Sequence, residues 1–175
     1  IDTLIYAGWI IPVEPDNVVY EHHAVAIQDG KILAILPSSD AVGQFEARFT
    51  HHLSTHLLIP GLINTHTHAA MNLLRGFAED MSLQDWLTTR IWPAEHQHVS
   101  PEFVIDGTKL ALAEMLRSGI TCYNDMYFFP DVEGEVVDQV GIRATIGLIV
   151  LDGPTPWGKD AADYLTKARA VYDKF

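Results

Sequence analysis

The sequence has little cysteine, little positive charge and no long apolar run. Cys122 is the only cysteine in 175 residues, so no internal disulfide can form and a reducing, cytoplasmic location is expected. The first residues, Ile1 to Val13, carry no basic segment and no cleavage pattern of a secretory signal. No apolar stretch reaches the roughly 18 residues that a membrane span needs. Secretion and membrane insertion are therefore not predicted.

Basic residues are outnumbered, 11 against 23 acidic ones, which gives a net charge of −12. No cluster of lysine and arginine exists, so neither nucleic acid nor an anionic membrane is an expected partner. The hydrophobic content of 48% with 19% charged residues is typical of a folded globular protein. The oligomeric state stays open, and a homo-oligomer is compatible with these numbers.

The first 58 residues are predicted to form a small β segment. Thr3 to Val13 and Val18 to Ile27 are rich in isoleucine, valine and tyrosine. Asp29-Gly30 is a strong hairpin signal that joins the second run to a third strand, residues 31–36. Ser38-Ser39-Asp40 is expected to cap a short helix that continues to about Ala47.

From residue 57 the pattern alternates between strands and helices. The apolar run Leu57 to Asn64 is interpreted as one buried strand, and Ser82 is predicted to cap a helix that ends at Pro93. Ser100, Pro101 and Gly119 mark the start and stop of the next helix. The remaining elements are predicted as a strand over 121–129, a helix over 132–140, a strand over 142–151 and a helix over 160–175. Such alternation predicts a parallel sheet in either a doubly wound fold or a (β/α)₈ barrel, and the glycine fingerprint of the first is absent.

His66-Thr67-His68 is the most informative motif, because it follows the apolar run that is interpreted as a strand. Alternate side chains of a strand point the same way, so the two imidazoles are expected to lie together and to bind a divalent metal. The alternative is that both histidines face solvent. His96 and His98 have the same spacing, but on a helix two such residues point about 200° apart and are expected to be solvated. The other histidines, in polar connections or alternating across a strand, are also expected to be solvated.

The residues around this motif carry a family resemblance. The stretch from Pro60 to His68 is similar to the opening metal motif of the amidohydrolase superfamily. The stretches Asn72 to Leu87, Ile91 to Glu95 and Ser118 to Tyr127 resemble the branch of 5-methylthioadenosine and S-adenosylhomocysteine deaminases. The match runs through essentially all residues. It implies the N-terminal part of a metal-dependent α/β (TIM) barrel, residues 59–175, preceded by a β-sandwich segment, residues 1–58.

The resemblance implies hydrolytic deamination of the 6-amino group of an adenine nucleoside, which releases ammonia and the inosine product. His66 and His68 match the first two ligands of one divalent ion, Zn²⁺ or alternatively Fe²⁺. Glu95 matches the carboxylate that accepts hydrogen bonds from the ribose hydroxyls of the small-molecule substrate, a role that suits an acceptor-only group. Without the resemblance, Glu95 reads as a solvated acid at the end of a helix.

Two further candidates for substrate binding are Trp92 and Asp125. Trp92 lies close to Glu95 in the sequence, but it could equally be a packing residue, like Trp86. Asp125 lies near the end of a predicted strand, where barrel chemistry takes place, but a carboxylate there could equally cap the following turn. Arg75 could position the loop after the first barrel strand or reach the substrate, and we favour the first interpretation.

A complete barrel needs about 250 residues and eight strands, and this chain supplies three. In the resembled family the third metal histidine, the acid/base glutamate, a further histidine and the metal aspartate lie on later strands, so no catalytic acid or base is assigned here. We therefore expect an N-terminal portion of a longer enzyme, inactive by itself, and the missing initiating methionine fits a truncated start. The alternatives are a chlorohydrolase-like enzyme, a guanine or cytosine deaminase, or a non-catalytic binding module on the same scaffold.

Overall fold

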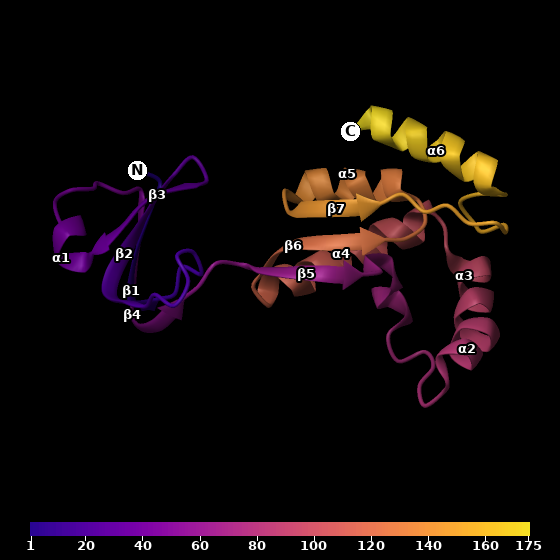
Figure 1. Cartoon of the computed structure of the whole chain (residues 1–175), viewed down its shortest axis with the longest axis horizontal. Helices are drawn as coiled ribbons and strands as arrows, with labels where there is room; N and C mark the ends of the chain where they lie inside the picture. The colour runs from indigo at the N-terminus through magenta and orange to yellow at the C-terminus, as the bar shows by residue number, and fades with distance from the viewer. The chain divides into compact units, whose positions relative to one another are not determined.

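The computed structural model describes all residues from 1 to 175 and divides them into two compact units, Ile1–Pro60 and Gly61–Phe175. The first unit is a four-stranded sheet in the order β3-β2-β1-β4 with one short helix (Figure 1). Neighbouring strands are antiparallel except β1 and β4, which are parallel. Its elements are β1 (Thr3–Ile10), β2 (Tyr20–Gln28), β3 (Lys31–Pro37), α1 (Ser38–Ala41) and β4 (Phe49–Leu58).

The predicted hairpin is confirmed, because β2 and β3 pair antiparallel around Asp29 and Gly30. Both residues have positive φ, 50° and 70°, as the tight turn between twisted strands requires. The predicted cap of α1 is wrong. Pro37 occupies the N-cap position without a side-chain hydrogen bond, and the helix ends at Ala41, so that only one turn forms.

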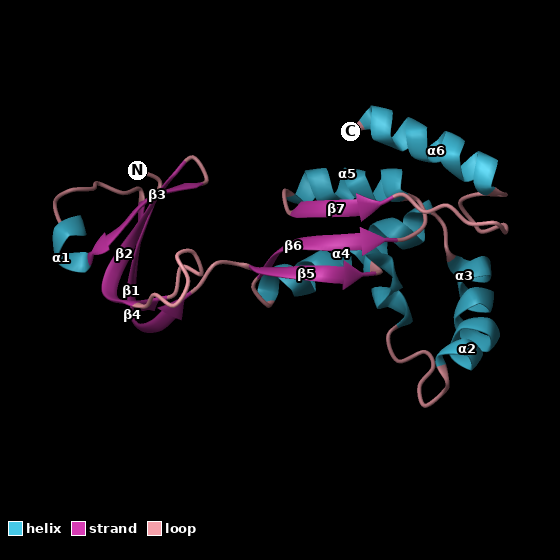
Figure 2. Ribbon diagram, in the orientation of Figure 1, coloured by secondary structure: helices cyan, strands magenta, loops and turns pink.

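The second unit is a three-stranded parallel sheet, β5-β6-β7, with helices in the connections (Figure 2). This confirms the α/β class and the parallel sheet. The elements are β5 (Leu62–Thr67), the 3₁₀ helix η1 (Ala69–Leu74), α2 (Leu83–Trp86), the π turn η2 (Leu87–Ile91), α3 (Trp92–His98), α4 (Pro101–Arg117), β6 (Ile120–Met126), α5 (Pro130–Val140), β7 (Arg143–Gly147) and α6 (Ala161–Lys174).

One face of this sheet is covered by α4 and α5. The core between them holds Leu112, Met115, Tyr123 and Val136, all buried. Alternation along β6 puts Tyr123 and Asp125 on this covered face, whereas Asn124 and Met126 lie on the other face and are exposed. The side chains of an uncovered sheet face are thus available to line a site.

The prediction that the apolar run Leu57 to Asn64 forms one strand is wrong, because the run contains parts of two strands. β4 ends at Leu58 and β5 starts at Leu62, in different sheets, because Pro60 and Gly61 interrupt the pairing. A side chain at position 61 would clash with Thr121, since its Cβ would lie 2.2 Å from the Thr121 hydroxyl oxygen. The strand is also not buried, because Leu62 and Ile63 are 52% and 66% exposed.

The helix that starts after Ser82 was predicted to end at Pro93, but the structure shows that it continues. Ser82 does cap α2, since its hydroxyl accepts from the backbone N–H of Asp85 at 3.2 Å. The chain then passes through the π turn η2 and continues as α3, with Pro93 in the first turn of α3. Proline lacks an N–H and its ring clashes with the preceding turn, and the wider π turn accommodates both effects.

The start of α4 is as predicted. Ser100 accepts from the N–H of Phe103 at 3.2 Å, Pro101 occupies the first turn, and Gly119 follows the helix with φ 85°. The two later strands are shorter than predicted. β6 ends at Met126 and β7 at Gly147, because the chain beyond each leaves the sheet for the loops that border the candidate site.

An extra residue interrupts the pairing of β5 with β6. Asn64 pairs with Tyr123 and Thr67 with Asp125, so β5 advances three residues while β6 advances two. This β-bulge comprises Thr65 and His66 and lies at the carboxyl end of β5. Bulges redirect side chains and are common beside active sites.

Candidate active site

His66 and His68 lie together at the carboxyl end of β5. Their ring centroids are 5.2 Å apart and the ring planes are 77° to one another. Two imidazoles on one tetrahedral zinc, with Zn–N distances of about 2.0–2.1 Å, bring their centroids to about 5 Å apart. The arrangement of the two rings therefore fits a shared ion.

The ring of His68 is held by the neighbouring strand. Its Nδ1 lies 2.7 Å from the backbone carbonyl oxygen of Met126. A carbonyl can only accept, so Nδ1 carries the proton and donates it, which leaves the lone pair on Nε2. This orientation by a backbone carbonyl is the usual support of a metal-binding histidine.

No third histidine, cysteine, aspartate or glutamate joins the pair to complete a metal site. Two imidazoles alone leave a zinc ion short of the three protein ligands of a catalytic site. The donor set on this chain thus fits half of a metal centre. His96 and His98, on α3, are exposed, as their helical spacing predicted.

Glu95 is buried on α3, with only 7% of its surface exposed. The hydroxyl of Tyr127 donates to its Oε1 at 2.8 Å. Burial raises the pKa of Glu95 above its usual value, while the hydrogen bond from Tyr127 and the electrostatic effect of the neighbouring His68 oppose that shift. Glu95 is therefore not the solvated acid of the alternative interpretation.

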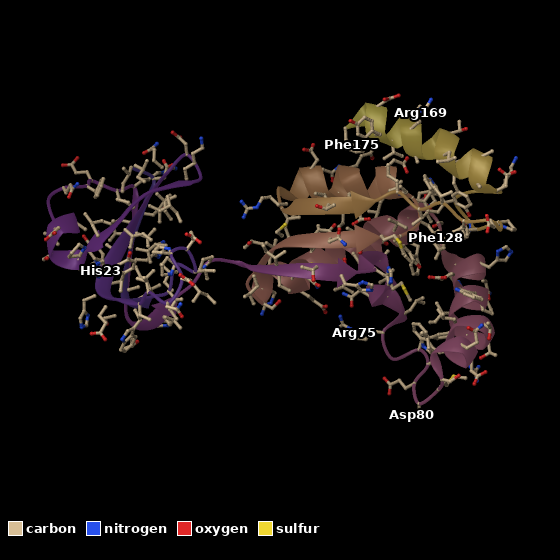
Figure 3. The ribbon with its side chains drawn as sticks, viewed as in Figure 1. His23, Arg75, Asp80, Phe128, Arg169 and Phe175 are labelled. Carbon is tan, nitrogen blue, oxygen red and sulfur yellow. The ribbon has the colours of Figure 1, made fainter.

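One cavity of about 540 Å³ is lined both by a candidate metal ligand and by the candidate substrate-binding carboxylate. Its polar side chains include His68 and Glu95, and its walls are largely apolar, with Trp92 among them. Phe128, which is labelled in Figure 3, also lines the cavity. The other lining residues are Met71, Leu83, Trp86, Leu87, Ile91, Met126, Tyr127, Leu148, Ile149, Val150 and Leu151. A concave, mainly apolar space with a few converging polar groups is typical of a site for a small molecule.

Asp125, the other candidate for substrate binding, is not among the residues that line this cavity. It is 1% exposed, and its Oδ1 accepts from the N–H of Ala69 at 2.7 Å and from the hydroxyl of Thr67. These donors lie on either side of His68. The carboxylate thus holds the segment that carries the histidines.

Arg75 forms hydrogen bonds with Glu114 on α4 and with Asn72 on η1. The guanidinium lowers the pKa of Glu114 to about 2. Both side chains are largely exposed, so the ion pair adds little stability. These contacts agree with the interpretation of Arg75 as a residue that positions the loop.

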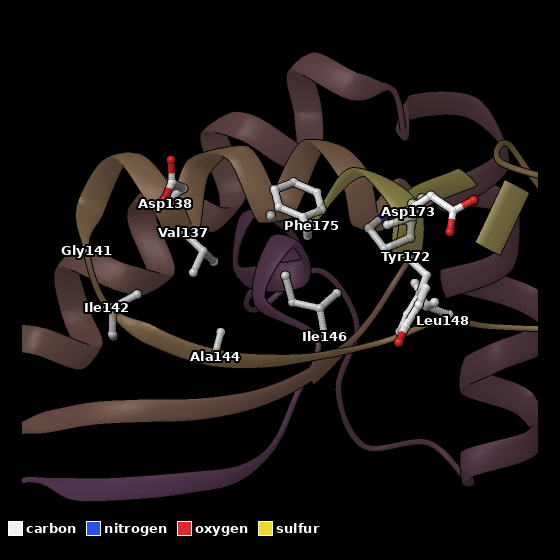
Figure 4. Close-up of a pocket in the computed structure, with 13 residues that line it drawn as sticks. Val137, Asp138, Gly141, Ile142, Ala144, Ile146, Leu148, Tyr172, Asp173 and Phe175 are labelled. Atoms are coloured by element: carbon white, nitrogen blue, oxygen red, sulfur yellow. The ribbon is translucent and has the colours of Figure 1, made fainter. Parts of the chain in front are cut away.

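A larger cavity, of about 850 Å³, lies between α5, β7 and α6 (Figure 4). Its walls are mainly apolar and include Val137, Ile146, Tyr172 and Phe175. None of the candidate site residues lines it. Although this cavity is the larger of the two, it is therefore not the candidate functional site.

The amidohydrolase family model matches residues 57–174, which is more than half of the chain. The chain belongs to the amidohydrolase family. Among curated relatives, this amidohydrolase is 47% identical over 174 residues to the 5-methylthioadenosine/S-adenosylhomocysteine deaminase of Saccharophagus degradans. The match covers 99% of this chain but 39% of that protein. The chain thus spans about two fifths of the length of such relatives.

Solved structures support the same fold. An adenosine deaminase from Xanthomonas campestris with bound zinc matches with a TM-score of 0.96 and 47% identity, over 99% of this chain and 39% of that one. The guanine deaminase of E. coli matches with a TM-score of 0.82 at 17% identity, over 99% and 44%, and shows the fold alone. No helix of this amidohydrolase is both long and apolar enough to cross a membrane.

Several residues that shape the site were not singled out from the sequence. Tyr127, Thr67 and the carbonyl of Met126 each contact a candidate residue or its backbone. Glu133 and Tyr123 form a buried pair behind Asp125. The run Asn124 to Tyr127 contributed to the family resemblance, but its spacing alone does not indicate which side chains turn inward.

Proposed function

We propose that this chain contributes half of a zinc centre and the ribose-binding carboxylate to a larger hydrolytic deaminase. The proposed substrates are 5-methylthioadenosine and S-adenosylhomocysteine, whose adenine 6-amino group leaves as ammonia. The observation that carries the proposal is the presence of His68, with His66 beside it, and Glu95 in one cavity. A divalent ion held by the histidines supplies Lewis-acid activation of water for hydrolysis.

The side chains of this chain would bind and orient the nucleoside. Tyr127 occupies one oxygen of Glu95, and the other oxygen is free to accept from ribose hydroxyls. The apolar wall around Trp92 suits an adenine ring or a thioether substituent, which gain from leaving water. Residues 1–175 do not complete the metal site, so the activity is proposed for the complete protein, in the cytoplasm.

Zinc content and nucleoside kinetics test the proposal together. In the complete protein we expect about one zinc per subunit, and loss of that zinc in His66→Ala. Glu95→Ala removes charged hydrogen bonds to the substrate, each worth about 1.5–3 kcal/mol, so kcat/KM for methylthioadenosine should fall about 10- to 150-fold. Glu102→Ala, which removes an exposed carboxylate in the first turn of α4, is the control and should change neither value.

The same variants separate the related enzymes. If Glu95→Ala leaves kcat/KM for methylthioadenosine unchanged, the nucleoside assignment is wrong and a base or triazine substrate without ribose is favoured. If the complete protein binds no zinc, the enzyme proposal fails and the non-catalytic binding module replaces it.

A further inference from the structure

A buried carboxylate forms hydrogen bonds with the segment that carries the two histidines. Asp125 accepts from Thr67 and Ala69, the residues that immediately precede and follow His68. The next residue of β6, Met126, accepts from His68 itself. The carboxyl end of β6 thus fixes the backbone of β5 on both sides of His68, and the ring between them.

Asp125 is in turn supported by a second buried carboxyl group. Glu133 on α5 is 1% exposed and accepts from the hydroxyl of Tyr123 at 2.8 Å. Its carboxyl group also contacts that of Asp125, and burial together with the charge of Asp125 raises the pKa of Glu133 to about 8. The Oδ2 of Asp125 is buried and has no hydrogen-bond partner. A protonated Glu133 would be a donor beside the Asp125 carboxyl group.

Such an arrangement costs free energy. A buried carboxylate is tolerated only when it is paired or hydrogen-bonded, and here it accepts from a backbone N–H and a hydroxyl. All the groups that this carboxylate binds on β5 and η1 lie within two residues of His66 or His68. The hydrogen bonds of this buried carboxylate therefore fix the position of the metal-binding segment.

We propose that Asp125 is a positioning residue of the metal centre, which holds Thr67 and Ala69 so that His66 and His68 converge, with the buried acid Glu133 beside its carboxyl group. This inference rests on the proposed zinc site. It assigns to Asp125 a role other than substrate binding or capping of the turn after β6.

The test compares Asp125→Ala with Asp125→Asn in the complete protein. Asparagine keeps an oxygen that accepts from Thr67 and Ala69, whereas alanine removes both bonds. We expect the zinc Kd, measured by competition with a chromophoric chelator, to rise about 10- to 100-fold in Asp125→Ala. Asp125→Asn should stay within about threefold of the wild type.

A second measurement needs no metal. In the zinc-free protein the N–H of Ala69 should be protected from hydrogen exchange in the wild type and in Asp125→Asn, and should lose that protection in Asp125→Ala. Tyr164→Phe is the control for general destabilisation, because it removes a buried hydroxyl that donates to Gly153 and Gly158. It should lower Tm without changing the zinc Kd.

The outcomes separate this inference from the proposed function. Absence of zinc from the wild type would remove the metal site and the positioning role together. Zinc in the wild type with an unchanged Kd in Asp125→Ala would overturn the positioning role alone. If Asp125→Ala does not fold, Thr67→Val deletes one of the same bonds at constant shape, and an unchanged zinc Kd in that variant would also overturn the inference.

Discussion

Tyr127 connects the two polar parts of the candidate site. Its hydroxyl donates to Glu95, and its ring centroid lies 6.3 Å from that of His68. Burial and the neighbouring carboxylate raise the pKa of Tyr127, so the phenol stays protonated and remains a donor at all working pH values. The residue thus occupies one of the two oxygens of Glu95.

Replacing Tyr127 with phenylalanine should weaken nucleoside binding. The variant leaves Glu95 buried without its donor, and a lost hydrogen bond to a charged group corresponds to about tenfold or more in binding. We expect KM for methylthioadenosine to rise about tenfold with little change in kcat, because the ribose contact exists in both ground and transition states. Tyr172→Phe, at a position 77% exposed, is the matched control. Equal KM values in the two variants would contradict this role.

Glu133 should make stability depend on pH. In the unfolded chain a glutamate releases its proton near 4.5, whereas in the native state Glu133 keeps it to about 8. Between these values the native state binds more protons, so the free energy of unfolding falls as pH rises. The titratable groups that face Glu133 are Tyr123 and Asp125.

Glu133→Gln should remove that dependence, because the amide is a neutral donor at every pH. Urea unfolding from about pH 5 to about pH 8 is the measurement, with Asp138→Asn, an exposed acid on the same helix, as control. Parallel stability curves for Glu133→Gln and the wild type across this range would mean that Glu133 is ionised throughout.

At the scale of elements, the start of α4 offers a direct comparison. Ser100 accepts from the N–H of Phe103, whereas Ser38 and Ser39, the first two residues of α1, provide no capping bond. Ser100→Ala should therefore lower the free energy of unfolding by about 1 kcal/mol, and Ser38→Ala should change it little. Urea unfolding of both variants tests this, and equal losses would show that the two serines have the same role.

Elements with local signals could be predicted from the sequence. The hairpin at Asp29-Gly30 and the cap at Ser100 depend on the preferences of one or two residues, which act within a single turn. The helix through Pro93 could not be predicted, because a proline usually ends a helix and no local signal indicates the π turn before it. The division of the apolar run at Pro60 depends on which sheet each half joins.

The parts of the candidate site that depend on local spacing could likewise be predicted from the sequence. The pair His66 and His68 follows from a local spacing, and the family resemblance adds Glu95. The contacts of Asp125 and Tyr127 join residues 32 to 58 positions apart, and no local pattern reports such distances. The network behind the histidines therefore needed the three-dimensional structure.

At the scale of the molecule, the parallel sheet has two free edges. β5 and β7 each pair on one side only, and Ile63 on β5 is 66% exposed. Unpaired edges and exposed apolar side chains promote association between chains. Residues 1–175 produced alone should therefore associate as concentration rises.

Sedimentation across a range of concentrations is the measurement for that expectation. Ile63→Lys places a charge on the free edge strand and should shift the segment toward the monomer. Lys31, already charged on β3 of the other unit, offers a control as Lys31→Arg, which should leave association unchanged. A wild-type segment that stays monomeric at all concentrations would show that these edges are protected.

Because of the bulge in β5, the direction in which the histidine side chains point depends on the number of residues between Asn64 and Thr67. Strand side chains alternate between two faces, so removing Thr65 would turn every later residue of the strand to the opposite side. Both rings would then point toward α4 and α5 and away from the cavity, although no histidine had been replaced. A single insertion or deletion between Asn64 and Thr67 would therefore misdirect both histidines at once.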